Sequence, residues 1–251
     1  MLQGDFTELA EAYVHRPAYA APVIDLIVSM VRSVVRSPVV ADVGAGTGKL
    51  TEMLAARGLA GVAIEPNQAM REQGEQLHLR GFTWFTCRAE STGLASASVD
   101  WITMASAFHW ADAPRALAEF HRVLRPGGFL TLLWNPRDLT HDGLQADIER
   151  DIAAIVPDIR RRSSGGAAYT DGLEDVLLGS GFRDLVFLEA PHIEEMTRER
   201  HLGAWRSVND IRAQAGEEKW ATILSAIEAR LGEQKQIAVR YRTRAWLVRK
   251  G

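Results

Sequence analysis

Apolar positions change their spacing along the chain in a way that predicts alternating strands and helices. Short apolar runs bounded by glycine, proline or polar residues predict strands at 39–43, 61–65, 82–87, 98–104 and 129–134. Between them, apolar residues recur every three to four positions, as in helices that bury one side. This alternation is typical of an α/β fold with a doubly wound, mostly parallel sheet covered by helices on both faces. We therefore expect the strand ends to meet at one edge, where such folds bind ligands.

The flanking parts of the chain are less regular. Residues 5–36 are expected to be helical, with an apolar stripe in the segment PVIDLIVSMVRSVV. In the second half we expect a polar, glycine-rich loop at 160–170, a strand at 183–190 and helices within 194–232. Alternating apolar and basic residues predict a last strand at 237–249, antiparallel to its neighbour. The sheet then has seven strands, and a helical cap covers its ligand-binding edge.

Composition and charge exclude several classes of protein. The chain has 251 residues, 47% of them hydrophobic and 24% charged, and a formal net charge of −3. This balance gives no global attraction to nucleic acid or to an anionic membrane. A single cysteine, Cys87, excludes an internal disulfide, and the seven histidines add no spacing typical of a metal site. The acidic N-terminus and the lack of a long apolar run lead us to expect a cytoplasmic protein.

Three glycines, Gly44, Gly46 and Gly48, follow the first predicted strand and open the next helix. Glycines there let the backbone turn tightly and approach a ligand closely. Lys49 stands where a dinucleotide fingerprint needs a further glycine, and a leucine follows it where a phosphate-binding P-loop needs serine or threonine. Glu65 ends the second strand, where a carboxylate can accept hydrogen bonds from ribose hydroxyls. The pattern favours a ligand with an adenosyl ribose and no pyrophosphate.

Four segments in order resemble the class I S-adenosylmethionine-dependent methyltransferases. ADVGAGTGK resembles their first motif, AIEPNQAM the acidic second motif, CRAESTGLASASVDWITMASAFHW the adenine segment with the fourth strand, and EFHRVLRPGGFLTLLWN the helix–turn–fifth-strand signature. The resemblance spans 39–135 and implies a Rossmann-like methyltransferase fold, with S-adenosylmethionine as cofactor and S-adenosylhomocysteine as product. The segments AYVHRPAY, AFHW and WN are similar to the type 11 small-molecule branch that includes trans-aconitate methyltransferases.

The resemblance also implies how the chain is divided. The expected parts are an N-terminal helical lid (1–38), a cofactor-binding core (39–135), a helical cap that forms the substrate region (136–170 and 191–236), and the remainder of the core sheet (171–190 and 237–251).

Matching positions carry over an implied set of cofactor contacts. Tyr13 and Arg16 would fold over the cofactor as a lid, and Arg16 could pair with its carboxylate. Asp42 would orient the glycine loop or reach the cofactor amine through water. Arg88 stands where the family often has an aspartate, which moves the adenine contact to Glu90 or to the backbone. The full implied set is Tyr13, Arg16, Asp42, Gly44, Ala45, Gly46, Thr47, Glu65, Pro66, Met70, Ala89, Glu90, Met104 and Ala105.

Residues after the fourth and fifth strands are candidates for the acceptor side. His109 could act as a base or bind the acceptor, with Trp110 as an apolar wall; alternatively, His109 caps a helix and Trp110 packs under the lid. Asn135, beside Trp134, could orient the acceptor or serve only the turn before a proline. In the cap, Arg206 could clamp an acidic substrate or simply be solvated.

Methyl transfer from a sulfonium is an in-line displacement that depends mainly on positioning and on exclusion of water. A base is needed only when the nucleophile starts protonated. We expect methyl transfer to an oxygen, nitrogen or carbon nucleophile of a small metabolite, with a carboxylate as one candidate by analogy to the aconitate branch. The identity of the acceptor and the oligomeric state are left open.

Three alternatives stay open. The first is an enzyme with another adenosyl or nicotinamide ligand, which Lys49 disfavours. The second is a tRNA or protein methyltransferase, although WNPR does not match the N/D-P-P-Y/F tetrapeptide of exocyclic-amine methylation. The third is a non-catalytic binder of an adenosyl ligand with the same fold.

Overall fold

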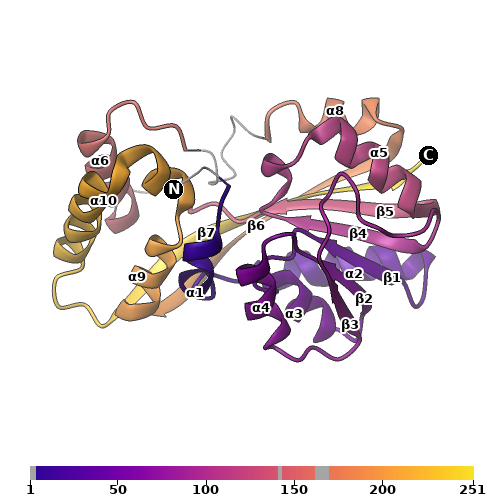
Figure 1. Cartoon of the computed structure of the whole chain (residues 1–251), viewed down its shortest axis with the longest axis horizontal. Helices are drawn as coiled ribbons and strands as arrows, with labels where there is room; N and C mark the ends of the chain where they lie inside the picture. The colour runs from indigo at the N-terminus through magenta and orange to yellow at the C-terminus, as the bar shows by residue number, and fades with distance from the viewer. Residues whose placement is uncertain (1–3, 141–142, 162–169) are drawn as a thin grey trace.

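Seven strands form one sheet in the order β3-β2-β1-β4-β5-β7-β6, which confirms the predicted fold class (Figure 1). The computed structural model describes residues 4–140, 143–161 and 170–251. Strands β1 to β5 are parallel, and β7 runs antiparallel to both β5 and β6. The strands are β1 (Val39–Val43), β2 (Ala60–Ile64), β3 (Phe82–Phe85), β4 (Val99–Ala105), β5 (Leu124–Trp134), β6 (Phe182–Thr197) and β7 (Gln236–Lys250).

Helices cover both faces of this sheet. On one face, α2 (Ala21–Val34) and α3 (Lys49–Ala55) bury residues such as Ile27 and Leu54. On the other face, α5 (Ala113–Val123) and α8 (Leu173–Gly179) bury residues such as Phe120. The further elements near the ligand-binding edge are η1 (Thr7–Leu9), α1 (Ala10–Tyr13), α4 (Gln68–Glu75) and η2 (Phe108–Trp110).

A helical subdomain extends the sheet beyond its core (Figure 1). Strand β7 pairs with β5 only from Arg244 onward, so its first half pairs with β6 alone and projects as a two-stranded arm. Against this arm pack α6 (Leu144–Ile155), α9 (Arg198–Arg206) and α10 (Asn209–Leu231) around a separate apolar core. We call these three helices with the projecting arm the cap.

The structure corrects several predicted boundaries. The single helix expected at 5–36 is interrupted between Tyr13 and Ala21, because Pro17 lacks the N–H and has a ring that clashes with the preceding helical turn. Residues 194–197, expected to be helical, continue β6 because they pair with β7 up to Thr197. Residues 191–197 therefore belong to the arm. The loop expected at 160–170 falls mostly on 162–169, outside the described residues.

Of the described helices, none combines the length and the apolar character needed to cross a membrane.

Candidate functional site

The glycine loop lies at the carboxyl edge of the sheet, between β1 and α3. Gly44 has a φ of +66°, and a Cβ built there would lie 2.7 Å from the Cβ of Ala107, so only glycine fits. The N–H groups of Gly44 and Ala45 donate to the carbonyl of Ile64 at 2.8 and 3.0 Å, which ties the loop to the end of β2. Gly48, also left-handed, begins α3. The loop is thus held in a shape that leaves backbone accessible to a ligand.

Two buried carboxylates flank this loop. Glu65 accepts hydrogen bonds from the N–H groups of Gly46 at 2.9 Å and Asn67 at 2.8 Å, and burial raises the pKa of its carboxyl group. Asp42 accepts hydrogen bonds from two threonine hydroxyls, one on α3 at 2.6 Å and one on β4 at 2.8 Å. Burial raises the pKa of Asp42 to about 6, so the carboxylate is mostly ionised at neutral pH.

The loop opens into two adjoining cavities. The first, of about 590 Å³, lies beside β2 and includes Glu65 and Arg88; we call it the β2 compartment. The second, of about 200 Å³, reaches toward the cap and includes Arg137 and Arg161; we call it the cap compartment. Five residues line both compartments: Tyr13, Gly44, Gly46, Ala105 and Ser106. The two cavities therefore form one continuous cleft.

Every residue that the resemblance implies for cofactor binding lines this cleft. Their roles as contacts stay predictions, but the structure brings the whole set together from distant segments. The β2 compartment holds Glu65, Pro66, Met70, Ala89, Glu90 and Met104; the cap compartment holds Arg16, Asp42, Ala45 and Thr47; Tyr13, Gly44, Gly46 and Ala105 lie in both.

The N-terminal segment crosses the cleft and is anchored to the cap. Arg16 donates from Nε to the Oγ of Ser207 at 2.7 Å and from a terminal nitrogen to its carbonyl at 3.1 Å, at the junction of α9 and α10. The guanidinium of Arg16 also lies 4.8 Å from the ring centroid of Tyr13. Further in, the hydroxyls of Tyr19 and Ser106 lie 3.1 Å apart. This segment can therefore act as a lid that is already attached to the cap.

The structure places the aromatic residues predicted for the acceptor side away from the cap compartment. Trp110 lines the β2 compartment, where its ring packs edge-on against Phe6 with centroids 5.7 Å apart. Trp134 is buried in the core, and its Nε1 donates to Nδ1 of His109 at 3.1 Å. Neither Trp134 nor His109 is among the described residues that line the cleft, because the exposed end of β5 begins only at Asn135. The geometry gives no support to His109 as the base.

Two polar residues predicted for the acceptor side, Asn135 and Arg206, have partners within the chain. Asn135 lines the cap compartment, but its Nδ2 donates to the carbonyl of Ala18 at 2.9 Å and its Oδ1 accepts from Thr243 at 2.8 Å. Its amide thus anchors the lid to β7. Arg206 is half exposed and pairs with Glu228 at 3.5 Å, outside the cleft. Arg206 is not among the described residues that line the cleft, so the structure gives no support to its predicted role as a clamp.

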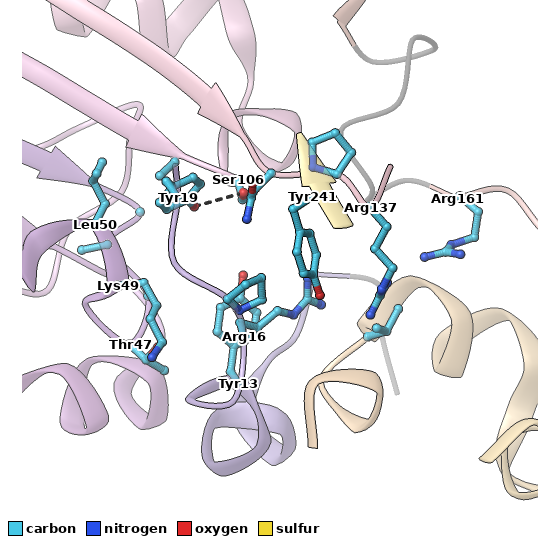
Figure 2. A pocket seen from close by; sticks show the side chains of 18 of the residues that line it. Tyr13, Arg16, Tyr19, Thr47, Lys49, Leu50, Ser106, Arg137, Arg161 and Tyr241 are labelled. Carbon is cyan, nitrogen blue, oxygen red and sulfur yellow. Dashed lines mark hydrogen bonds between the residues drawn. The ribbon is translucent and has the colours of Figure 1, made fainter. Parts of the chain in front are cut away.

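Sequence reasoning found Tyr13 and Arg16 but missed Tyr241, Arg137 and Arg161 in the cap compartment. In Figure 2, Thr47 in the glycine loop and Lys49 at the start of α3 face the cleft, and Arg16 reaches into its middle. Tyr241, Arg137 and Arg161 approach from the cap side. Arg137 stands in WNPR, three residues after the end of β5 at Trp134. This position close to the carboxyl end of a strand was the available signal. Arg161 stands in RRR at 160–162, where a solvated loop was the simpler interpretation.

Comparisons with known proteins agree with this geometry. The methyltransferase domain family matches residues 41–132. An uncharacterized methyltransferase of Mycobacterium tuberculosis is 43% identical over 123 residues, 49% of this chain and 48% of that protein. The ubiquinone/menaquinone biosynthesis C-methyltransferase UbiE of Rubrivivax gelatinosus is 37% identical over 95 residues, 36% of this chain and 37% of that protein. The alignments thus span about half or less of these curated relatives.

The similarity to solved structures extends further along the chain. A structure from Anaeromyxobacter dehalogenans, provisionally assigned as a type II methyltransferase, superimposes with a TM-score of 0.65 at 24% identity. The match covers 94% of this chain and 97% of that chain, so it includes the cap and confirms the fold. Residues 41–132 therefore match the methyltransferase domain family, in a chain that has the fold of a solved methyltransferase structure over nearly its whole length.

Proposed function

We propose that this chain transfers a methyl group from S-adenosylmethionine to a small molecule bound in the cap compartment. One observation carries the proposal: the glycine loop and the Glu65 carboxylate open into two joined compartments, with the predicted cofactor residues around their junction. The similarity to a quinone-biosynthesis C-methyltransferase supports a small-molecule acceptor. The cytoplasmic location and the absence of a nucleic-acid partner remain predictions.

The residues present fit an adenosyl cofactor. Glu65 uses each carboxylate oxygen for one backbone N–H, which leaves lone pairs that can accept from ribose hydroxyls. Asp42, mostly ionised near neutral pH, places a negative charge where the cofactor's ammonium group would bind. Met70 and Met104 supply polarizable apolar walls to the β2 compartment. When bound, the cofactor supplies an electrophilic methyl group on its sulfonium.

The chain's own residues mainly position the acceptor and exclude water. The lid is held across the cleft by Arg16 and Asn135, so it limits access of solvent to the junction of the compartments. Burial raises the pKa of Tyr19, which keeps its hydroxyl protonated at neutral pH. Tyr19 and Ser106 can therefore orient an acceptor atom, but Tyr19 does not serve as a base. This arrangement suits an acceptor that arrives deprotonated or loses its proton readily.

Calorimetric titration with S-adenosylmethionine, S-adenosylhomocysteine and NAD tests the proposal. We expect micromolar binding of the first two ligands and none of NAD, followed by cofactor turnover when an acceptor is present. Binding of NAD alone, or of no adenosyl ligand, would overturn the proposed function. Cofactor binding without turnover across a broad acceptor screen would favour the non-catalytic binder.

A further inference from the structure

Arg137 lies directly after β5, in the wall of the cap compartment (Figure 2). Its backbone is fixed on both sides by β7: the N–H of Arg242 donates to the carbonyl of the preceding residue at 2.9 Å, and the N–H of the following residue donates to the carbonyl of Arg240 at 2.9 Å. Its guanidinium carbon lies 3.8 Å from the ring centroid of Trp205, which is fully buried in α9. The guanidinium is therefore preorganised before any ligand binds.

A hydrogen bond to His201 holds the Trp205 ring in place beneath Arg137. The indole Nε1 of Trp205 donates to Nε2 of His201 at 3.2 Å. Burial lowers the pKa of His201 to about 4, so the imidazole is neutral near pH 7 and its Nε2 can accept this hydrogen bond. Trp205 is thus anchored by packing and by a hydrogen bond, and it presents its ring to Arg137.

Arg137 forms no ion pair within the described part of the chain, although Glu149 lies close enough to act on its charge. Its Nε is buried without a hydrogen-bond partner among the described residues. The nearby Arg161 differs, because it pairs with both Glu149 and Asp210. A partly buried guanidinium that forms no ion pair carries a desolvation cost which a bound anion can offset.

The compartment as a whole has the same imbalance. Four basic side chains and two acidic ones are among the described residues that line it: Arg16, Lys49, Arg137 and Arg161 against Asp42 and Glu149. S-adenosylmethionine does not correct this excess, because its sulfonium and ammonium groups outnumber its one carboxylate. Asp210 pairs with Arg161 from outside the compartment and offsets part of this excess, and a negatively charged second ligand beside Arg137 would offset the rest.

We propose that Arg137 binds a carboxylate of the methyl acceptor, so that the enzyme acts on small organic acids; this inference rests on the proposed function. A planar guanidinium matches a carboxylate with two parallel hydrogen bonds. Phosphate offers similar oxygens, so the test of this inference compares the two kinds of anion directly. Tyr241 and Leu139 complete a wall against which the carbon skeleton of the acid can pack.

Titration of the protein saturated with S-adenosylhomocysteine tests this inference. The probes are malonate, succinate, glutarate and benzoate, with their amides and inorganic phosphate as comparisons. We expect at least one acid to bind and its amide not to bind. Arg137→Gln should weaken binding of the acid about 10- to 100-fold, as expected for loss of charge-assisted hydrogen bonds. Arg137→Lys should weaken it less, and Arg206→Gln should have no effect.

Binding of S-adenosylhomocysteine reports separately on folding and on the proposed function. An affinity unchanged in Arg137→Gln shows that the variant folds. Loss of this affinity with normal binding of 5′-methylthioadenosine, which lacks the amino-acid part, would assign Arg137 to the cofactor and overturn the inference. So would acid binding that Arg137→Gln leaves intact, preference for phosphate, or no acid bound at all. Failure of the wild type to bind any adenosyl ligand would instead overturn the proposed function.

Discussion

The two compartments of the cleft are built in physically different ways. The β2 compartment depends on backbone shape and on one carboxylate: Gly44 and Gly46 have positive φ angles, and Glu65 bonds to the loop itself. The cap compartment depends on side chains that come from the lid, β5, β7 and the cap, above all Arg16, Arg137 and Tyr241. Backbone shape restricts which residues fit, whereas the side chains of a cap can be exchanged without altering the sheet. The two compartments should therefore respond differently to substitution.

The strongest test of the comparison is to fill the glycine loop. Gly46 has a φ of +59°, and its nearest contact for an added Cβ is the flexible end of Met70 at 3.3 Å. Gly46→Arg should reduce affinity for S-adenosylmethionine at least about 100-fold, because a long side chain would occupy the junction of the compartments. Calorimetry measures this loss.

Gly216→Arg is the matched control for Gly46→Arg. Gly216 also has a positive φ of +73°, but it lies in α10 with nothing within 4 Å of a built Cβ. This control also places an arginine at a glycine with a positive φ, but outside the cleft, so it should bind the cofactor normally. Equal loss of binding in both variants would mean that strain, and not occupation of the loop, explains the effect.

Asp42 is expected to connect stability and binding. Its pKa of about 6 in the folded chain exceeds the ordinary value of 3.8, so between these values the folded state binds more protons than the unfolded state. Stability therefore falls as pH rises through this window. Asp42→Asn should add about 2 kcal/mol of stability near pH 7.5 and much less near pH 4, while it weakens cofactor binding.

Urea unfolding at the two pH values measures the effect at Asp42. The exposed Asp25, which pairs with Arg57 at the surface, provides the control variant Asp25→Asn. A variant Asp42→Asn that is less stable than the wild type at both pH values would show that the threonine hydrogen bonds outweigh the cost of burying the charge.

Glu65→Gln should reduce affinity for S-adenosylmethionine about tenfold, or about 1.4 kcal/mol. A glutamine presents one acceptor oxygen in place of two, while the loop N–H groups compete for it. Calorimetry checks the change, with the exposed Glu72→Gln on α4 as the control. Unchanged affinity in Glu65→Gln would remove the carboxylate from the proposed ribose site.

The sequence predicted the β2 compartment better than the cap compartment, and the difference in how the two are built explains why. The glycine spacing and Glu65 were sufficient to place the β2 compartment, since those contacts depend on local backbone shape at fixed points of a regular sheet. Arg137 could not be identified in this way, because its environment is set by Trp205 and Tyr241, which lie far along the chain. Arg206 looked equivalent in the sequence, and only the packing of α9 and α10 places it outside the cleft.

Weakening the contact between the lid and the cap should have a smaller effect on cofactor binding. Ser207→Ala removes the acceptor of the 2.7 Å hydrogen bond from Arg16 Nε, but the carbonyl of the same residue still accepts from the guanidinium. We expect about a threefold faster dissociation of S-adenosylmethionine, in line with loss of one side-chain hydrogen bond. Stopped-flow displacement measures the rate, and Ser180→Ala at the end of α8 is the control. An unchanged rate would separate the lid from cofactor retention.

The smallest expected effect is that of Arg206→Gln, which contrasts Arg206 with Arg137. Arg206 is 50% exposed and its partner Glu228 is 45% exposed, so their contact is screened by water. Arg206→Gln should change affinities for cofactor and acid less than about twofold, and should alter stability by less than about 0.5 kcal/mol. Steady-state kinetics and urea unfolding check both quantities. A clear loss of acid binding in this variant would mean that the acceptor reaches past the cap compartment onto the outer face of α9, and that the positive charge around Arg137 is only part of the binding surface.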